Sequence, residues 1–319
     1  MCKTQTPLRR FIVDTDTGSD DVWAIMEALR ATDIVRVEAI TVVCGNLPLD
    51  LCVKNAMLAA EAADTYLPPV YRGMERPILN PEAFYAPEVH GEDGLGGMNL
   101  PAPQRPAETK HAMDAIIDLV MANPGEMEIV TCGPLTNLAM ALLKEPRLAE
   151  NIKKVWILGG SAGGTGNMTD VAEYNIYADP EAASIVLNAK LDTVWVTWDN
   201  AVGETEITPA EVERLRACGD PAAAFCARCT RQLRAYYREV QGRDTFAVID
   251  ALVMTAALYP EIMEGVFQSH CSIELAAGDL RGFFRMDAGQ SPNAAVCPAV
   301  KVPLFKQRLF ALLGAESKS

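Results

Sequence analysis

The chain has 319 residues, 50% of them hydrophobic, and its 28 Lys and Arg residues against 42 Asp and Glu residues give a net charge of −14. This length and composition suffice for a large buried core, whereas the negative charge argues against nucleic acid and anionic membrane surfaces as partners, because both are polyanions. No apolar stretch approaches the roughly 20 residues of a membrane helix, and the N-terminal residues lack a secretory apolar region. The nine cysteines do not show the paired spacing of a disulfide framework. We therefore expect a cytoplasmic protein with reduced thiols.

Apolar strand candidates alternate with amphipathic helix candidates along most of the chain. Strands are predicted at 11–13, 37–43, 128–131, 155–158, 193–197 and 270–275. Near-continuous apolar strands separated by helices are typical of a mostly parallel central sheet with helices on both faces. The more charged segment 203–262 predicts a helical insertion or cap near the pocket. We therefore predict a single α/β domain over residues 1–319.

Four aspartates follow the first predicted strand, within the segment DTDTGSDD at 14–21. Parallel sheets bind ligands beyond the carboxyl ends of their strands, so these side chains are expected to point into that crevice. Ser19 or Asp20 can cap the helix that begins near Asp21, but capping accounts for only one or two acids. Crowded carboxylates favour a hard cation such as Ca²⁺ or Mg²⁺.

Other predicted strands end in small or polar residues at the same edge, at 44–46, 131–133 and 159–160. A metal-dependent phosphohydrolase of the haloacid dehalogenase type is one alternative, since that class also begins with a strand and an Asp-x-Asp pair. Those enzymes place Gly then Thr after the pair, whereas this chain has Thr17 then Gly18. The alternative is therefore a weak one.

Several segments, in the same order along the chain, resemble the inosine-uridine type of nucleoside hydrolases. They are DTDTGSDD at 14–21, CGN at 44–46, HGEDGLGG at 90–97, TCGPLTNLA at 131–139, GNMTDVAEYNIYADPEAA at 166–183 and LRGFFRMD at 280–287. The resemblance implies an enzyme that hydrolyses the N-glycosidic bond of a ribonucleoside to ribose and free base. It also implies a homodimer or homotetramer.

The resemblance further implies a role for each matching residue. A Ca²⁺ ion would be held by Asp16, Asp21, the backbone carbonyl of Thr131 and Asp250, and Asp16 would take the proton of the attacking water. The ribose hydroxyls would be bound by Asp20, Asn46, Asn167, Glu173 and Asn175, since carboxylates and amides suit hydroxyl partners. Glu173 and Asn175 share one face if their segment is extended.

The chain departs from many members of that family at the residue before the last metal-binding aspartate. Those members have a histidine there that protonates the leaving base, whereas this chain has Ile249. His90 is then the expected catalytic contributor on the base side. Further candidates for base contacts are Phe84, Tyr85, Tyr236, Tyr237 and Arg243, whereas Trp198 is expected to pack in the protein.

The missing histidine leaves two further hypotheses open. The chain can be a hydrolase for a base that leaves easily, such as a modified purine or nicotinamide, or a non-catalytic sensor that binds ribose or a nucleoside. No pattern in the sequence selects the base.

Overall fold

The computed structural model describes residues 7–316, which form a nine-stranded sheet in the order β3-β2-β1-β4-β5-β6-β10-β8-β9. The strands from β3 to β10 pair in parallel, and β8 and β9 complete the sheet in the antiparallel sense. This arrangement confirms the mostly parallel α/β fold. The bounds are β1 (Arg9–Thr15), β2 (Val35–Val42), β3 (Val70–Arg72), β4 (Met127–Thr131), β5 (Lys154–Leu158), β6 (Thr193–Val196), β8 (Phe267–Ile273), β9 (Phe284–Asp287) and β10 (Ala294–Cys297). A separate ladder joins β7 (Met263–Glu264) to β11 (Ala299–Val300).

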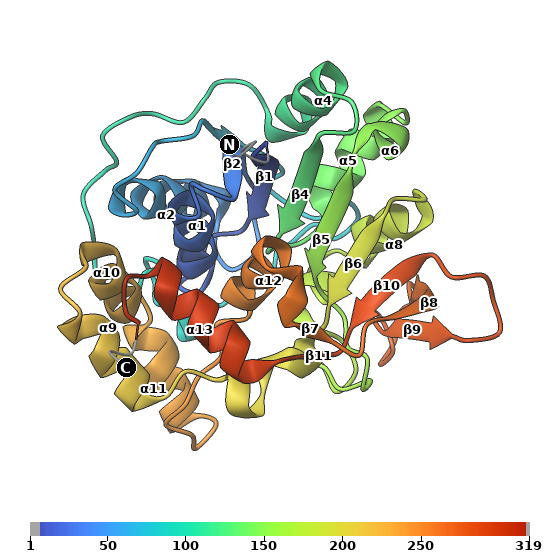
Figure 1. Ribbon diagram of the computed structural model, residues 1–319. Helices are drawn as coiled ribbons and strands as arrows, with labels where there is room; N and C mark the ends of the chain where they lie inside the picture. Colours follow the sequence, from blue (N-terminus) through green and yellow to red (C-terminus); the bar gives the residue numbers. More distant parts are fainter. Residues whose placement is uncertain (1–6, 317–319) are drawn as a thin grey trace, which may run out of the picture.

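Helices cover both faces of the sheet (Figure 1). One face carries α1 (Asp21–Arg30), α2 (Leu49–Ala62), α12 (Ile249–Leu258) and α13 (Val302–Leu312), and the other carries α4 (Ala112–Ala122), α5 (Thr136–Lys144), α6 (Leu148–Asn151) and α8 (Pro180–Asn188). Successive strand residues point to opposite faces, so Val13 and Val130 join the core under α1, whereas Ile12 and Ile129 join the core under α5. Two separate apolar clusters thus pack against the two faces of the sheet.

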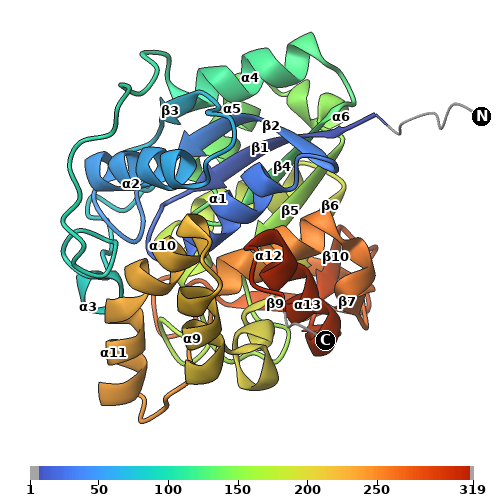
Figure 2. The same cartoon turned by 60° about the vertical axis from the view of Figure 1, so that its left-hand side comes forward.

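The segment 203–262 contains α9 (Pro209–Ala217), α10 (Pro221–Cys229), α11 (Arg231–Glu239) and α12, together with the short turns η2 (Gly203–Thr205) and η3 (Pro260–Ile262). The helix α11 contacts the short helix α3 (Pro87–His90), beside which it lies in Figure 2. Every residue of α12 is buried, and α12 packs against α1. That helix therefore belongs to the core rather than to a cap.

Across residues 7–316, no helix combines the length and the apolarity needed to cross a membrane.

Candidate functional site

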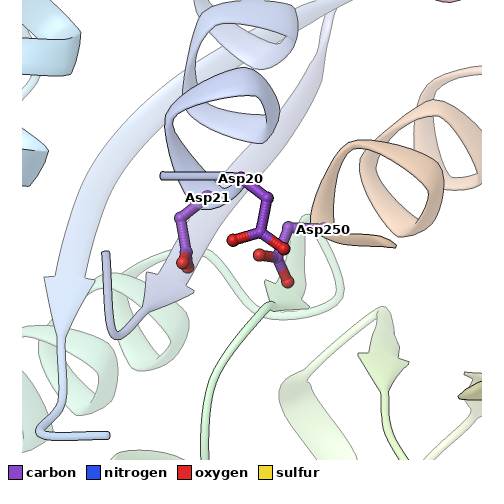
Figure 3. Close-up of side chains that lie close together, drawn as sticks. All are labelled: Asp20, Asp21 and Asp250. Carbon is purple, nitrogen blue, oxygen red and sulfur yellow. The ribbon is translucent and has the colours of Figure 1, made fainter. Parts of the chain in front are cut away.

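Three carboxylates from two helices meet at the carboxyl edge of the sheet. Asp20 and Asp21 stand at the start of α1, and Asp250 stands in the first turn of α12. One oxygen from each of the three lies within 4.8 Å of the others, and Figure 3 shows the carboxyl groups turned toward one another. Because α1 and α12 pack side by side, distant parts of the sequence supply one acidic cluster.

Asp16 follows the end of β1 in a very confined position. Its Oδ2 accepts a hydrogen bond of 2.7 Å from the backbone N–H of Asn46, whereas its buried Oδ1 has no hydrogen-bond partner within residues 7–316. A Cβ atom on Gly45 would lie 2.0 Å from Oδ2, and one on Gly133 would lie 2.7 Å from Oδ1. Glycine at the ends of β2 and β4 therefore makes room for this carboxylate.

Asp21 is held by its own loop. Its Oδ1 accepts from the Thr15 hydroxyl at 2.5 Å, and its Oδ2 accepts from the Gly18 N–H at 2.8 Å and the Asn46 amide at 3.2 Å.

The prediction that Ser19 or Asp20 caps α1 is wrong. Asp20 occupies the N-cap position without a side-chain capping bond, because its carboxyl group faces Asp250 (Figure 3).

The acidic cluster is electrostatically unfavourable without a cation. Burial, reinforced for Asp21 by the neighbouring Asp20 charge, raises the pKa of Asp20 and Asp21 to about 6. Burial and the neighbouring acids raise the pKa of Asp16 and Asp250 well above the ordinary range. Buried carboxylates with unpaired oxygens, such as Oδ1 of Asp16 and of Asp20, form a donor set that fits a hard divalent cation.

His90, at the end of α3, is buried beside the same loop. Its Nδ1 accepts the backbone N–H of Ser19 at 3.2 Å and lies 3.0 Å from the Ser19 hydroxyl and 3.7 Å from Oδ1 of Asp20. A backbone N–H can only donate, so the proton of the neutral ring resides on Nε2. Burial lowers the pKa of His90 to about 4. His90 is thus a neutral hydrogen-bond donor.

Glu173 and Asn175 are arranged differently from the sequence-based prediction. Glu173 is the N-cap of α7 (Tyr174–Ala178), and its carboxylate accepts from the N–H groups of Asn175, Ile176 and Gly160 at 2.9, 3.2 and 3.1 Å. The segment is therefore helical, and the extended geometry is wrong because the carboxylate nucleates a helix. Burial raises the pKa of Glu173 to about 7. The Asn175 amide donates to the Cys132 carbonyl at 3.0 Å.

A cavity of about 290 Å³ opens above the acidic cluster. Its polar lining brings together most of the predicted site, namely Asp20, Asn46, His90, Asn167, Glu173, Asn175 and Asp250. Three predicted residues, Asp16, Asp21 and Thr131, do not line the cavity and are fully buried. Thr131 ends β4, as predicted. Polar predicted residues therefore line the cavity, and Asp16, Asp21 and Thr131 lie buried outside its lining.

The cavity lining also contains aromatic and apolar side chains. Tyr85, Tyr236 and Tyr237 line it, as predicted, and so does Ile249. Phe84 instead packs on Tyr177, with ring centroids 5.2 Å apart, and Arg243 pairs with Glu206.

Trp198 packs against the apolar core, as expected, and in addition it lines the cavity, which was not expected. The strand β6 stops at Val196, and Trp198 begins the turn η1 (Trp198–Ala201), which directs the ring out of the sheet. Sequence reasoning also missed Val89, Met168 and Leu233 in the lining. These residues carry no recognisable signal, because apolar side chains in helices and loops most often serve packing.

Comparison with known proteins agrees with this geometry. The sequence profile described as "Inosine-uridine preferring nucleoside hydrolase" matches residues 11–307. Probable uridine nucleosidase 1 of Oryza sativa subsp. japonica is 35% identical over 252 residues, which cover 79% of this chain and 77% of the relative. Two solved structures superpose with a TM-score of 0.90. The plant nucleoside hydrolase PpNRh1 is 29% identical, with 97% of this chain and 100% of that chain covered, and the purine-preferring ribonucleoside hydrolase from Gardnerella vaginalis is 26% identical, with 96% and 98% covered.

These matches decide between the hypotheses. They support neither a dehalogenase-type phosphohydrolase nor a non-catalytic sensor, and the metal dependence of the family accords with the acidic cluster. The chain belongs to the inosine-uridine preferring nucleoside hydrolase family and is an N-glycosyl hydrolase of ribonucleosides.

Proposed function

We propose that the hydrolysis depends on Ca²⁺ held by Asp16, Asp21, Asp250 and the Thr131 carbonyl, with Asp16 as the general base. The observation that carries this proposal is that one oxygen each of Asp20, Asp21 and Asp250 lies within 4.8 Å of the others. Asp16 is near enough that burial together with the Asp21 charge raises its pKa. The donors are all oxygen atoms, and a Ca²⁺ ion accepts six to eight such ligands in flexible geometry. When bound, the ion lowers the pKa of a coordinated water.

Asp20 and Asp21 receive different roles because they differ in exposure. Asp20 is 9% exposed and lines the cavity, whereas Asp21 is completely buried beneath it. Asp20 is therefore available to a ribose hydroxyl, and Asp21 is confined to the floor. The unpaired Oδ1 of Asp16 is the free acceptor that a general base requires.

The remaining polar residues act on the sugar and the base. The attacking water gives its proton to Asp16 while the bond from ribose C1′ to the base nitrogen breaks and the sugar gains positive charge. The ribose hydroxyls are bound by Asp20, Asn46, Asn167, Glu173 and Asn175, all of which line the cavity. The water oxygen forms the new bond to C1′, and His90 assists the departing base by donating a hydrogen bond from Nε2. The proton taken by Asp16 passes to solvent, and the base nitrogen takes one proton from solvent in exchange. Ribose and free base are the products.

The aromatic side chains that line the cavity suit a planar base without selecting one. Tyr85, Trp198, Tyr236 and Tyr237 offer stacking surfaces. Similar proteins include both a probable uridine nucleosidase and a purine-preferring ribonucleoside hydrolase. A base that leaves easily, such as a modified purine or the nicotinamide of nicotinamide riboside, remains a substrate hypothesis because Ile249 occupies the position of the usual acid.

The test is release of reducing sugar from a panel of purine, pyrimidine and nicotinamide ribosides, with and without added Ca²⁺. Asp16→Asn is expected to lower kcat by about 10³-fold while the far-ultraviolet circular dichroism stays unchanged. Glu27→Gln is the matched control, since Glu27 is another buried acid of the same region that does not line the cavity. Near wild-type turnover of Asp16→Asn, or turnover unaffected by a chelator, would contradict the proposal.

We also propose a cytoplasmic homodimer or homotetramer. In support of a reducing compartment, the eight cysteines within the described residues are all free thiols. Size-exclusion chromatography with light scattering measures the oligomeric state. A monomeric mass at micromolar concentration would contradict the proposed homodimer or homotetramer.

A further inference from the structure

The segment that follows β5 is held by a single carboxylate from the neighbouring strand end. Asp199 accepts hydrogen bonds from the backbone N–H groups of Ala162 at 2.6 Å and Gly163 at 2.7 Å, and from the Ser161 hydroxyl at 3.3 Å. Within residues 7–316, these are the hydrogen bonds that reach 161–165 from outside the 161–172 loop. A Cβ atom on Gly163 would lie 2.6 Å from Oδ1 of Asp199, so glycine allows this close approach.

Asp199 itself stands on a rigid support. The N–H of the preceding residue, Trp198, donates to the Gly160 carbonyl at 2.9 Å. The buried amide of the following residue, Asn200, donates to the Cys297 carbonyl at 2.9 Å, which ties η1 to the end of β10. The Asp199 carboxylate is therefore fixed relative to the sheet.

The outer half of the 161–172 loop bonds mainly to itself. The N–H groups of Asn167 and Met168 donate to the Ala172 carbonyl at 3.2 and 3.1 Å, and Oδ1 of Asn167 accepts from the Tyr174 N–H at 2.8 Å. Asn167 and Met168 both line the cavity. The placement of this self-contained turn over the cavity thus depends on how its two ends are anchored, by Asp199 on one side and by Glu173 on the other.

We propose that Asp199 is a positioning residue, which fixes the 161–172 loop over the cavity and thereby sets the affinity for the nucleoside. The inference rests on the proposed function, because the loop contributes Asn167 to the ribose contacts. Asp199 does not line the cavity and touches no reacting atom. Its removal should therefore weaken substrate binding more than it slows the chemical step.

The experiment compares Asp199→Ala, Asp199→Asn and Asp199→Glu with wild type. For the Ala variant we expect KM to rise about tenfold or more, the equivalent of one lost charge-assisted hydrogen bond, with kcat within about threefold. The Asn variant keeps one acceptor and should be intermediate, and the Glu variant should restore part of the affinity by returning a carboxylate. Asp287→Asn is the control, since Asp287 is an exposed turn carboxylate that accepts from the Gly289 N–H at 2.8 Å, outside the cavity.

Hydrogen–deuterium exchange of the substrate-free protein gives a readout that needs no turnover. In Asp199→Asn, peptides from 161–172 should exchange faster, while peptides from β5 keep the wild-type rate. The proposal is overturned if the KM of Asp199→Ala and the exchange rate of the 161–172 peptides in Asp199→Asn stay within twofold of wild type. It is also overturned if the exchange rate rises equally throughout the protein. Failure of the proposed function would show instead as a wild-type chain that releases no ribose, and the exchange result stands independently of it.

Discussion

Replacing Gly45 by alanine tests whether the site depends on the exact location of the Asp16 carboxylate. Gly45 has no positive φ, so alanine causes no backbone strain, and its whole effect comes from the added methyl group. That Cβ would lie 2.0 Å from Oδ2 of Asp16, against the 3.4 Å at which ordinary contact begins. The carboxylate or the strand end must therefore move by roughly 1.4 Å, and the hydrogen bond from the Asn46 N–H is lost or distorted.

A displacement of this size at the proposed general base is expected to lower kcat/KM by about 10²-fold, whereas overpacking should lower the free energy of unfolding by only about 1–3 kcal/mol. The assay is ribose release with the best substrate of the panel, alongside thermal unfolding. Gly133→Ala should act in the same direction from the other side of the carboxylate, with 2.7 Å to Oδ1.

Gly289→Ala is the control, because Gly289 also lacks a positive φ and the nearest atom to its added Cβ lies 3.1 Å away. If Gly45→Ala were folded and kept kcat/KM within threefold of wild type, the reasoning about Asp16 would be refuted.

Three further predictions concern the metal, the core and the base. Asp250→Asn should weaken Ca²⁺ binding about tenfold or more in isothermal titration calorimetry, and unchanged affinity would remove Asp250 from the ligand set. Glu27, buried in α1 with the Thr255 hydroxyl donating to it at 2.6 Å, has a carboxyl pKa held well above 4.5 by burial. The folded protein keeps that proton while the unfolded chain releases it, so stability falls as the pH rises above about 4.5. Glu27→Gln should therefore raise Tm at pH 8 clearly more than at pH 5, and an equal shift at both would contradict this. Trp198→Ala should raise KM about five- to tenfold through lost stacking on the base. An unchanged KM would contradict the stacking role and leave Trp198 with packing alone.

The five central parallel strands were predictable because they are short, apolar and mostly followed by helices. The predicted strands at 11–13, 128–131 and 155–158 lie within β1, β4 and β5. The strands β3, β9 and β10 of the sheet were missed. β10 reads AAVC and has little strand signal of its own, so its pairing with β6 and β8 is decided by tertiary contacts.

The site residues were predicted from local motifs. The errors arose where a side chain contacts residues that are distant in the sequence. A sequence shows that Asp20 precedes a helix and so suggests a cap, but it does not show that Asp250 lies opposite. Likewise, alternation within 173–175 suggested an extended segment, while the acceptor capacity of the Glu173 carboxylate allowed a helix to begin there. Trp198 is a further case. The sequence does not show that β6 ends at Val196 and that Trp198, at the start of η1, lines the cavity as well as packing against the core.

The pairing of α1 with α12 has a consequence for synthesis of the protein. Asp21 is made early and Asp250 late, and neither helix alone offers a complete set of oxygen donors to a cation. A nascent or truncated chain that ends before α12 should therefore neither retain the ion nor attack nucleosides. If the ion is Ca²⁺, as proposed, its acquisition would then mark the chain in which α1 and α12 have packed together.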